Sequence, residues 1–152
     1  MIEIKTFEDA IRFAIREEQN AIDYYLDLAT QVVNFESKTV LEQLARDEMR
    51  HREILYSILE NKNFKIESKP LATLNQLVFE DEEIETGSVQ SNFSVILTIA
   101  IRREIYAAKM YNHLASTCQN TEVSQLLVVI AEEELKHKKS LELELEYYSK
   151  PK

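Results

Sequence analysis

Glycine and proline, the residues that most often interrupt helices, are scarce in this chain of 152 residues. It contains one glycine and two prolines. So few helix breakers over this length favour long helices with few turns between them. The length also suits one unit with a core of its own, so we predict a single all-α domain over residues 1–152.

Cysteine is almost absent as well, because Cys118 is the single one in the sequence. An internal disulfide is therefore excluded. A zinc ribbon or an iron centre held by cysteines is also excluded, because each needs several thiolate ligands. We predict a structural role for Cys118.

Positive charge and long apolar runs are also in short supply. Lysine and arginine total 18 against 27 aspartates and glutamates, which gives a net charge of −9. We therefore expect no nucleic-acid partner that binds through its phosphates. No uncharged run approaches the ~20 residues that cross a bilayer, and the first residues lack the apolar core of a signal peptide. We expect a cytoplasmic protein with no membrane partner.

Apolar residues recur at three- and four-residue spacing in four stretches, which is typical of amphipathic helices. The predicted helices cover about residues 6–33, 37–61, 92–117 and 122–148. The irregular segment 62–91 between the second and third helices holds Pro70 and Gly87. It is too long for a simple turn and long enough to run the length of a bundle. We predict two antiparallel helix hairpins joined by this long crossover.

Polar residues interrupt each apolar stripe near its centre. They form two Glu-x-x-His motifs and two further glutamates. The six residues are Glu18, Glu48, His51, Glu104, Glu134 and His137. A carboxylate within an apolar stripe is costly to bury unless something pairs with it. These six are therefore the candidate metal-ligating and catalytic residues.

The two halves of the chain repeat at a spacing of 86 residues. Glu18 corresponds to Glu104 and Asn34 to Asn120, and the two Glu-x-x-His motifs also correspond. Shared helical patterning alone would place no polar matches inside the apolar stripes. Residues equidistant from the turn of an antiparallel hairpin lie at the same height. In each half, the asparagine lies at a predicted turn, midway between the single glutamate and the Glu-x-x-His motif. Two such hairpins packed face to face bring the six side chains together.

A dinuclear metal site explains this pattern better than a polar core that pairs with itself. Residues three apart on a helix lie one turn apart on one face, so Glu48 and His51 can reach the same ion. Four clustered carboxylates repel one another unless cations or protons neutralise them. Mixed imidazole and carboxylate ligation suits iron or manganese, and zinc is a possible substitute.

Four motifs resemble the rubrerythrin branch of the ferritin-like superfamily, without a rubredoxin domain. They are Glu18-x-x-Ala21-x-x-x-Tyr25, Asp47-Glu48-Met49-Arg50-His51, Glu104-x-x-Ala107-x-x-x-Tyr111 and Glu133-Glu134-Leu135-Lys136-His137. The resemblance implies a ferritin-like four-helix bundle with two iron ions bridged by carboxylates. It implies that Glu48 and Glu134 bridge the ions and that the other four residues complete the ligation. Which histidine shares an ion with which terminal glutamate stays open.

Residues next to these ligands have two possible roles. Tyr25 and Tyr111 are either ordinary core tyrosines or hydrogen-bond donors to a ligand carboxylate. Asp47 and Glu133 either accept a proton from a ligand histidine or are solvated. Met49 resembles a haem-binding methionine, but its repeat partner is a leucine, so packing is the better interpretation and haem is not expected.

The resemblance implies a di-iron oxidoreductase that reduces hydrogen peroxide or dioxygen with electrons from an external donor protein. Such a protein would act against oxidative stress, and we expect a homodimer. Two departures keep other functions open: the cysteine-bound iron domain of full-length rubrerythrins is missing, and Ala107 stands where they carry a further glutamate. The alternatives are a ferroxidase that handles iron and a non-catalytic metal-binding bundle.

Overall fold

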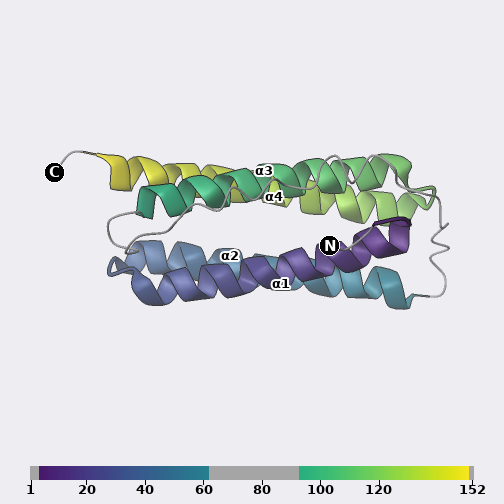
Figure 1. Ribbon diagram of the computed structural model, residues 1–152, viewed down its shortest axis with the longest axis horizontal. Helices are drawn as coiled ribbons and strands as arrows, with labels where there is room; N and C mark the ends of the chain where they lie inside the picture. The colour runs from purple at the N-terminus through teal and green to yellow at the C-terminus, as the bar shows by residue number, and fades with distance from the viewer. Residues whose placement is uncertain (1–3, 62–92, 151–152) are drawn as a thin grey trace.

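The computed structural model describes residues 4–61 and 93–150, and these form four long helices that lie side by side (Figure 1). The helices are α1 (Phe7–Gln31), α2 (Phe35–Glu60), α3 (Phe93–Thr117) and α4 (Thr121–Ser149). The described ranges contain no strand. The predicted all-α bundle is therefore confirmed, whereas the predicted crossover at 62–91 lies outside the described residues. No helix in these ranges combines the length and the apolar character that a membrane span requires.

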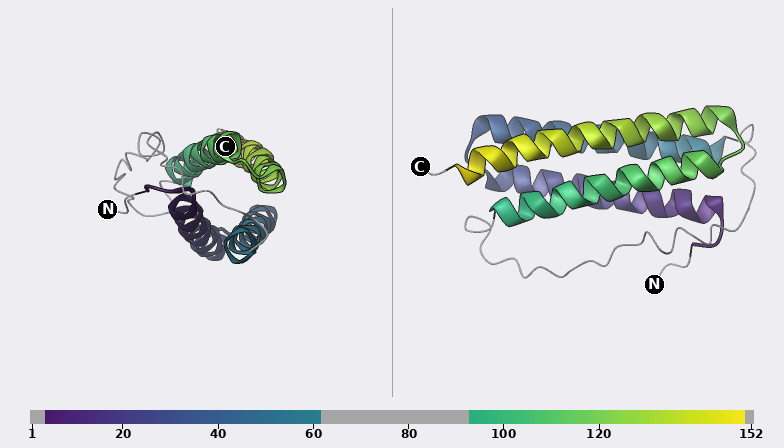
Figure 2. Two further views of the ribbon diagram at one scale, coloured as in Figure 1. Left: turned by 90° about the vertical axis from the view of Figure 1, so that its right-hand side faces the viewer. Right: turned by 90° about the horizontal axis from the view of Figure 1, so that it is seen from above.

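The bundle consists of two helix hairpins. Helix α1 packs along α2, and α3 packs along α4. The end-on view in Figure 2 shows the two hairpins facing each other, with α1 beside α3 and α2 beside α4. A hydrogen bond of 3.0 Å from the Tyr24 hydroxyl to the Ile96 carbonyl also joins α1 to α3. Each helix therefore presents one face to its own hairpin partner and another to the opposite hairpin.

Asparagine side chains set the start of the second helix in each hairpin. The Asn34 side chain accepts a hydrogen bond of 3.1 Å from the Ser37 backbone N–H, and Asn120 does the same for Val123. These N-caps satisfy backbone donors that the first helical turn leaves unpaired. Helix α2 consequently begins at Phe35, two residues before the predicted start, because the cap lies directly before the helix.

The apolar core is divided into two clusters, one towards each end of the bundle. One cluster combines the start of α1 and α4 with the end of α2 and α3, for example Ile11, Leu127 and Ile58. The other combines the opposite ends, for example Leu28 and Leu97. Full burial of such a side chain contributes about 1.5–3 kcal/mol. Two well-packed apolar regions therefore hold the middle layer of the bundle, where the stripes are interrupted by polar residues.

Candidate metal centre

The structure brings all six predicted site residues together in this middle layer. Seven polar or charged residues are buried in the described ranges, and six of them are the predicted site residues. The seventh, Ser37, has ordinary hydrogen bonds to Glu144 and Tyr148. The exposed fractions of the six range from 0% for His51 to 4% for His137. Buried ionisable groups in such number need a compensating charge or partner.

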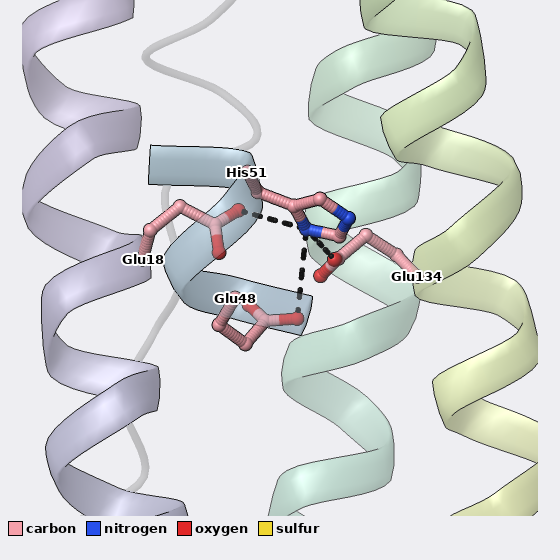
Figure 3. Close-up of side chains that lie close together, drawn as sticks. All are labelled: Glu18, Glu48, His51 and Glu134. Carbon is pink, nitrogen blue, oxygen red and sulfur yellow. Dashed lines mark ion pairs between the residues drawn. The ribbon is translucent and has the colours of Figure 1, made fainter. Parts of the chain in front are cut away.

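The six residues form two overlapping groups that could each hold a metal ion. One group is Glu18, Glu48, His51 and Glu134, and Figure 3 shows it in close-up. The other is Glu48, Glu104, Glu134 and His137. Within each group, one oxygen or nitrogen from every residue lies within 4.8 Å of the others. Glu48 and Glu134 belong to both groups, which is the placement expected of bridging ligands.

The grouping also indicates which histidine accompanies which terminal glutamate. His51 Nδ1 lies 3.8 Å from Glu18 Oε1, and His137 Nδ1 lies 3.6 Å from Glu104 Oε2. Each of these pairs comes from the two helices of one hairpin. The sequence left this pairing open because both histidines lie at the same height in the bundle.

Each histidine also faces a shared glutamate of the opposite hairpin. His51 Nδ1 lies 2.8 Å from Glu134 Oε1, and His137 Nδ1 lies 2.8 Å from Glu48 Oε1. The two imidazole rings stack with their centroids 5.8 Å apart. These equal distances show that the sequence repeat corresponds to a two-fold arrangement of side chains.

One buried atom of each predicted ligand lacks a hydrogen-bond partner in the structure. These atoms are Glu18 Oε2, Glu48 Oε1, His51 Nδ1, Glu104 Oε2, Glu134 Oε1 and His137 Nδ1. The short nitrogen–oxygen distances between them do not have hydrogen-bond geometry. Leaving a buried polar atom unsatisfied costs about 1–3 kcal/mol. Carboxylate oxygens and neutral imidazole nitrogens are ligands for divalent metal ions, so the residues present fit a pair of such ions.

Burial and mutual repulsion shift the pKa values of the shared glutamates. Burial raises the pKa of Glu48 well above its usual value, and the nearby Glu134 and Glu18 raise it further. Burial, together with Glu104 and Glu18, likewise raises the pKa of Glu134. Where no cation neutralises the site, these raised pKa values favour the protonated form of both carboxyls.

Two other residues of this six-residue Glu/His cluster, His137 and Glu18, have pKa values shifted by attractive contacts rather than by repulsion. Burial opposes the charged form of His137, but Glu104 and Glu48 raise its pKa to about 10. Burial likewise opposes ionisation of Glu18, yet its contacts with Glu48, His51 and Tyr111 hold its pKa below the usual value. Metal ions bind deprotonated ligands, so cations that bind here would displace the protons carried by these carboxyl and imidazole groups.

The outer nitrogen of each histidine contacts a carboxylate that precedes a shared glutamate. His137 Nε2 lies 3.0 Å from Asp47 Oδ2, and His51 Nε2 contacts Glu133 Oε2. Both contacts cross between α2 and α4. A carboxylate that accepts the Nε2 proton leaves the lone pair of Nδ1 directed at the cluster. Asp47 and Glu133 therefore orient the histidines of the opposite hairpin.

The two predicted tyrosines contact the terminal glutamates of the opposite hairpin. The Tyr25 hydroxyl donates to Glu104 Oε1, and the Tyr111 hydroxyl donates to Glu18 Oε1, each at 2.5 Å. Burial and the adjacent carboxylates raise both tyrosine pKa values well above the usual value, so the hydroxyls stay protonated. Each terminal glutamate thus has one oxygen held by a tyrosine and the other free of hydrogen bonds.

Arg50 is a site residue that the sequence did not reveal. Its Nη2 atom lies 2.5 Å from Glu133 Oε2, and its Nη1 atom lies 3.6 Å from Asp47 Oδ1. The guanidinium thus contacts the carboxylate partner of each histidine. The three-residue spacing from Asp47 was a usable signal, because residues three apart share a helix face. The contact with Glu133 depends on how α2 packs against α4.

Comparisons with known proteins identify the family and support the fold. A sequence model of the Rubrerythrin family matches residues 9–145. A crystal structure of a Thermotoga maritima protein, provisionally described as ferritin-like and diiron-carboxylate, has a TM-score of 0.70 and 24% sequence identity. The match covers 95% of this chain and 97% of that one, and it supports a ferritin-like fold. No protein with curated function matches. The family match spans most of the chain, and the protein belongs to the rubrerythrin family.

Proposed function

We propose that this protein is an oxidoreductase that reduces hydrogen peroxide or dioxygen at two iron ions, with electrons from a separate donor protein. The observation that carries the proposal is the set of six buried ligand atoms without hydrogen-bond partners. Glu48 and Glu134 would bind both ions, because they belong to both candidate groups. Glu18 with His51 would complete one ion's ligation, and Glu104 with His137 would complete the other's. The same ligands could bind manganese or zinc instead.

The choice of iron rests on the family. The chain belongs to the rubrerythrin family, and the similar Thermotoga maritima protein is described as diiron-carboxylate. Two ferrous ions supply two electrons for the reduction of an oxygen–oxygen bond. Reduction of hydrogen peroxide to two water molecules takes up two electrons and two protons. The sequence holds one cysteine, which is too few for a four-cysteine iron centre that could pass electrons to the site. The electrons would therefore come from a separate donor protein.

The chain's own residues support this chemistry by orienting the ligands. Tyr25 and Tyr111 each hold one oxygen of a terminal glutamate, while the glutamate's other oxygen faces the cluster. Asp47 and Glu133 fix the histidine rings from outside. Such outer contacts typically change metal affinity or activity by about 10–100-fold when they are removed. The predicted homodimer and cytoplasmic location remain predictions.

Rapid mixing of the iron-loaded protein tests the proposal. Protein loaded anaerobically with two ferrous ions per chain should gain the near-ultraviolet absorption of ferric iron when it is mixed with peroxide or dioxygen. Turnover should follow when a reductant is supplied. The Glu48→Gln variant should lose most of this response, because a shared ligand is neutralised. Glu132→Gln makes the same change at an exposed position of α4 and should react like the unmodified protein.

Two results would contradict the proposal. Ferrous protein that is oxidised by neither peroxide nor dioxygen has no such activity and would fit the non-catalytic bundle. Oxidation by dioxygen of far more iron than the protein can bind, in a large hollow assembly on size-exclusion chromatography, would indicate iron storage instead.

A further inference from the structure

A cavity of about 300 Å³ lies between α1 and α3 and reaches the cluster, among the residues that the structure describes. Its lining includes the exposed residues Asn20 and Arg103 and the buried residues Glu48 and Glu134. It therefore extends from the surface of the described bundle to the shared ligands. The side chains of Arg103 and Tyr24 contact each other in this lining, with the guanidinium carbon 5.2 Å from the ring centroid.

The cavity approaches the cluster from the side opposite the histidines. All four glutamates of the cluster line it, and neither histidine does. The outer nitrogens of the histidines instead face Asp47 and Glu133, between α2 and α4. A small molecule in the cavity would therefore meet the glutamates of the cluster and not its histidines.

The cavity is much larger than hydrogen peroxide or dioxygen requires. A water molecule takes up about 30 Å³ of liquid, and sites for organic ligands begin at about 300 Å³. Besides the glutamates, the lining contains apolar side chains, among them Phe13 and Met110. Ala21 and Ala107 correspond in the repeat and both line the cavity, so neither half of the chain fills it with a large side chain there. An apolar substituent on the substrate would bury apolar surface in this space.

We propose that the cavity binds organic hydroperoxides that carry a compact alkyl or aryl group, such as tert-butyl or cumyl. The inference rests on the proposed function and names a substrate class for the same site. The oxygen–oxygen bond of the hydroperoxide breaks as two electrons and two protons are taken up, and the products are one alcohol and one water. The electrons come from the external donor protein, and the apolar group stays between α1 and α3 throughout.

Binding of a product alcohol tests the cavity without any turnover. Saturation-transfer NMR on the zinc-loaded protein should show binding of cumyl alcohol. The Ala107→Leu and Ala21→Leu variants should lose it, because leucine fills the cavity from either half of the repeat. Asn112→Leu adds the same side chain at an exposed position of α3 that does not line the cavity, and it should bind like the unmodified protein. Circular dichroism and zinc stoichiometry establish that each variant is folded with its ligands in place.

Single-turnover oxidation of the iron-loaded protein then compares cumene hydroperoxide with hydrogen peroxide. The ratio of the two rates should fall about tenfold or more in Ala107→Leu and Ala21→Leu, and it should be unchanged in Asn112→Leu. Oxidation by hydrogen peroxide alone, with no alcohol binding, overturns the substrate class and leaves the proposed function standing. Equal rate ratios in all variants also overturn it. If neither peroxide oxidises the iron, the proposed function fails and the substrate class fails with it.

Discussion

At the scale of single residues, each terminal glutamate divides its two oxygens between a tyrosine and the cluster. Glu18 Oε1 accepts a hydrogen bond from Tyr111, while Glu18 Oε2 has no hydrogen-bond partner. Glu104 is held in the same way by Tyr25. The tyrosine fixes the rotation of the carboxylate and so presents the second oxygen to the centre. The carboxylate is therefore already oriented before an ion binds, which should increase the affinity for metal.

Replacing Tyr111 by phenylalanine should therefore weaken metal binding. The Tyr111→Phe variant leaves Glu18 without its donor, and removal of such a contact lowers affinity about tenfold or more. Competition between the protein and a chromophoric chelator for zinc measures the change. Tyr148→Phe also deletes a hydroxyl, which donates to Ser37 and touches no cluster residue, so it should leave zinc affinity unchanged. Equal affinities in all three proteins would mean that the tyrosine does not orient the ligand.

Protons held by the cluster give a second prediction at this scale. Burial and neighbouring carboxylates raise the pKa of Glu48 and Glu134, which favours their protonated forms when no metal is bound. His137, with a pKa of about 10, is also protonated. Metal binding needs the deprotonated ligands, so it should release protons, and affinity should rise as pH rises.

Calorimetry of zinc binding in buffers of different ionisation enthalpy measures this release. The observed heat should depend linearly on the buffer enthalpy at pH 7, with a slope that gives the number of protons released. Glu48→Gln should reduce that number, because the amide has no proton to release, whereas Glu132→Gln on the surface of α4 should not. A slope of zero would show that the metal-free cluster is already deprotonated.

At the scale of helices, the two asparagine caps define corresponding corners of the repeat. Asn34→Ala and Asn120→Ala should each lower the free energy of unfolding of the metal-free protein by about 1 kcal/mol, because each removes the hydrogen bond that caps α2 or α4. Urea unfolding monitored by circular dichroism measures both. Gln125→Ala, at an exposed position within α4, is the control and should change stability by less than about 0.5 kcal/mol. Losses no larger than the control's would show that the caps contribute little.

Helical periodicity explains why so much of the site could be predicted from the sequence. The apolar stripes predicted four helices, and polar interruptions such as Glu18 predicted where the buried layer lies, because burial of an unpaired carboxylate is costly. Equal spacing around Asn34 and Asn120 predicted that the layers of the two hairpins meet. These features follow from the spacing of residues along each hairpin and from the repeat that relates the two hairpins, and both can be read from the sequence.

Contacts between the hairpins could not be predicted in this way. Spacing places Tyr25 on the same face as Glu18, yet its hydroxyl bonds to Glu104 of the other hairpin. Likewise, nothing in the order of residues indicates that Arg50 reaches Glu133. Which faces of two helices meet depends on their rotation and packing distance. The cavity is a further example, since it depends on the volumes of side chains that α1 and α3 contribute together.

At the scale of the whole molecule, the candidate metal centre is the polar layer between two apolar clusters. Each candidate group takes ligands from three helices and from both hairpins: α1, α2 and α4 for one, and α2, α3 and α4 for the other. Two bound cations would thus link the hairpins and neutralise the repulsion between buried carboxylates at the same time. Metal-free protein should be held together mainly by the apolar clusters, whose contacts do not depend on the ions.

Metal should therefore stabilise the entire bundle rather than the middle layer alone. A ligand that binds only the folded state at 100 times its dissociation constant adds about 2.7 kcal/mol per site. For a chain of this length, each kcal/mol raises the melting temperature by about 2–4 °C, so one filled site should raise it by roughly 5–10 °C. Thermal unfolding with zinc or manganese, followed by circular dichroism and reversed with a chelator, measures the shift.

Glu134→Gln should remove most of it, because Glu134 belongs to both groups, whereas Glu132→Gln, two residues away on the exposed face, should retain it. An unchanged melting temperature with excess metal would mean that the six side chains do not bind ions across the hairpins.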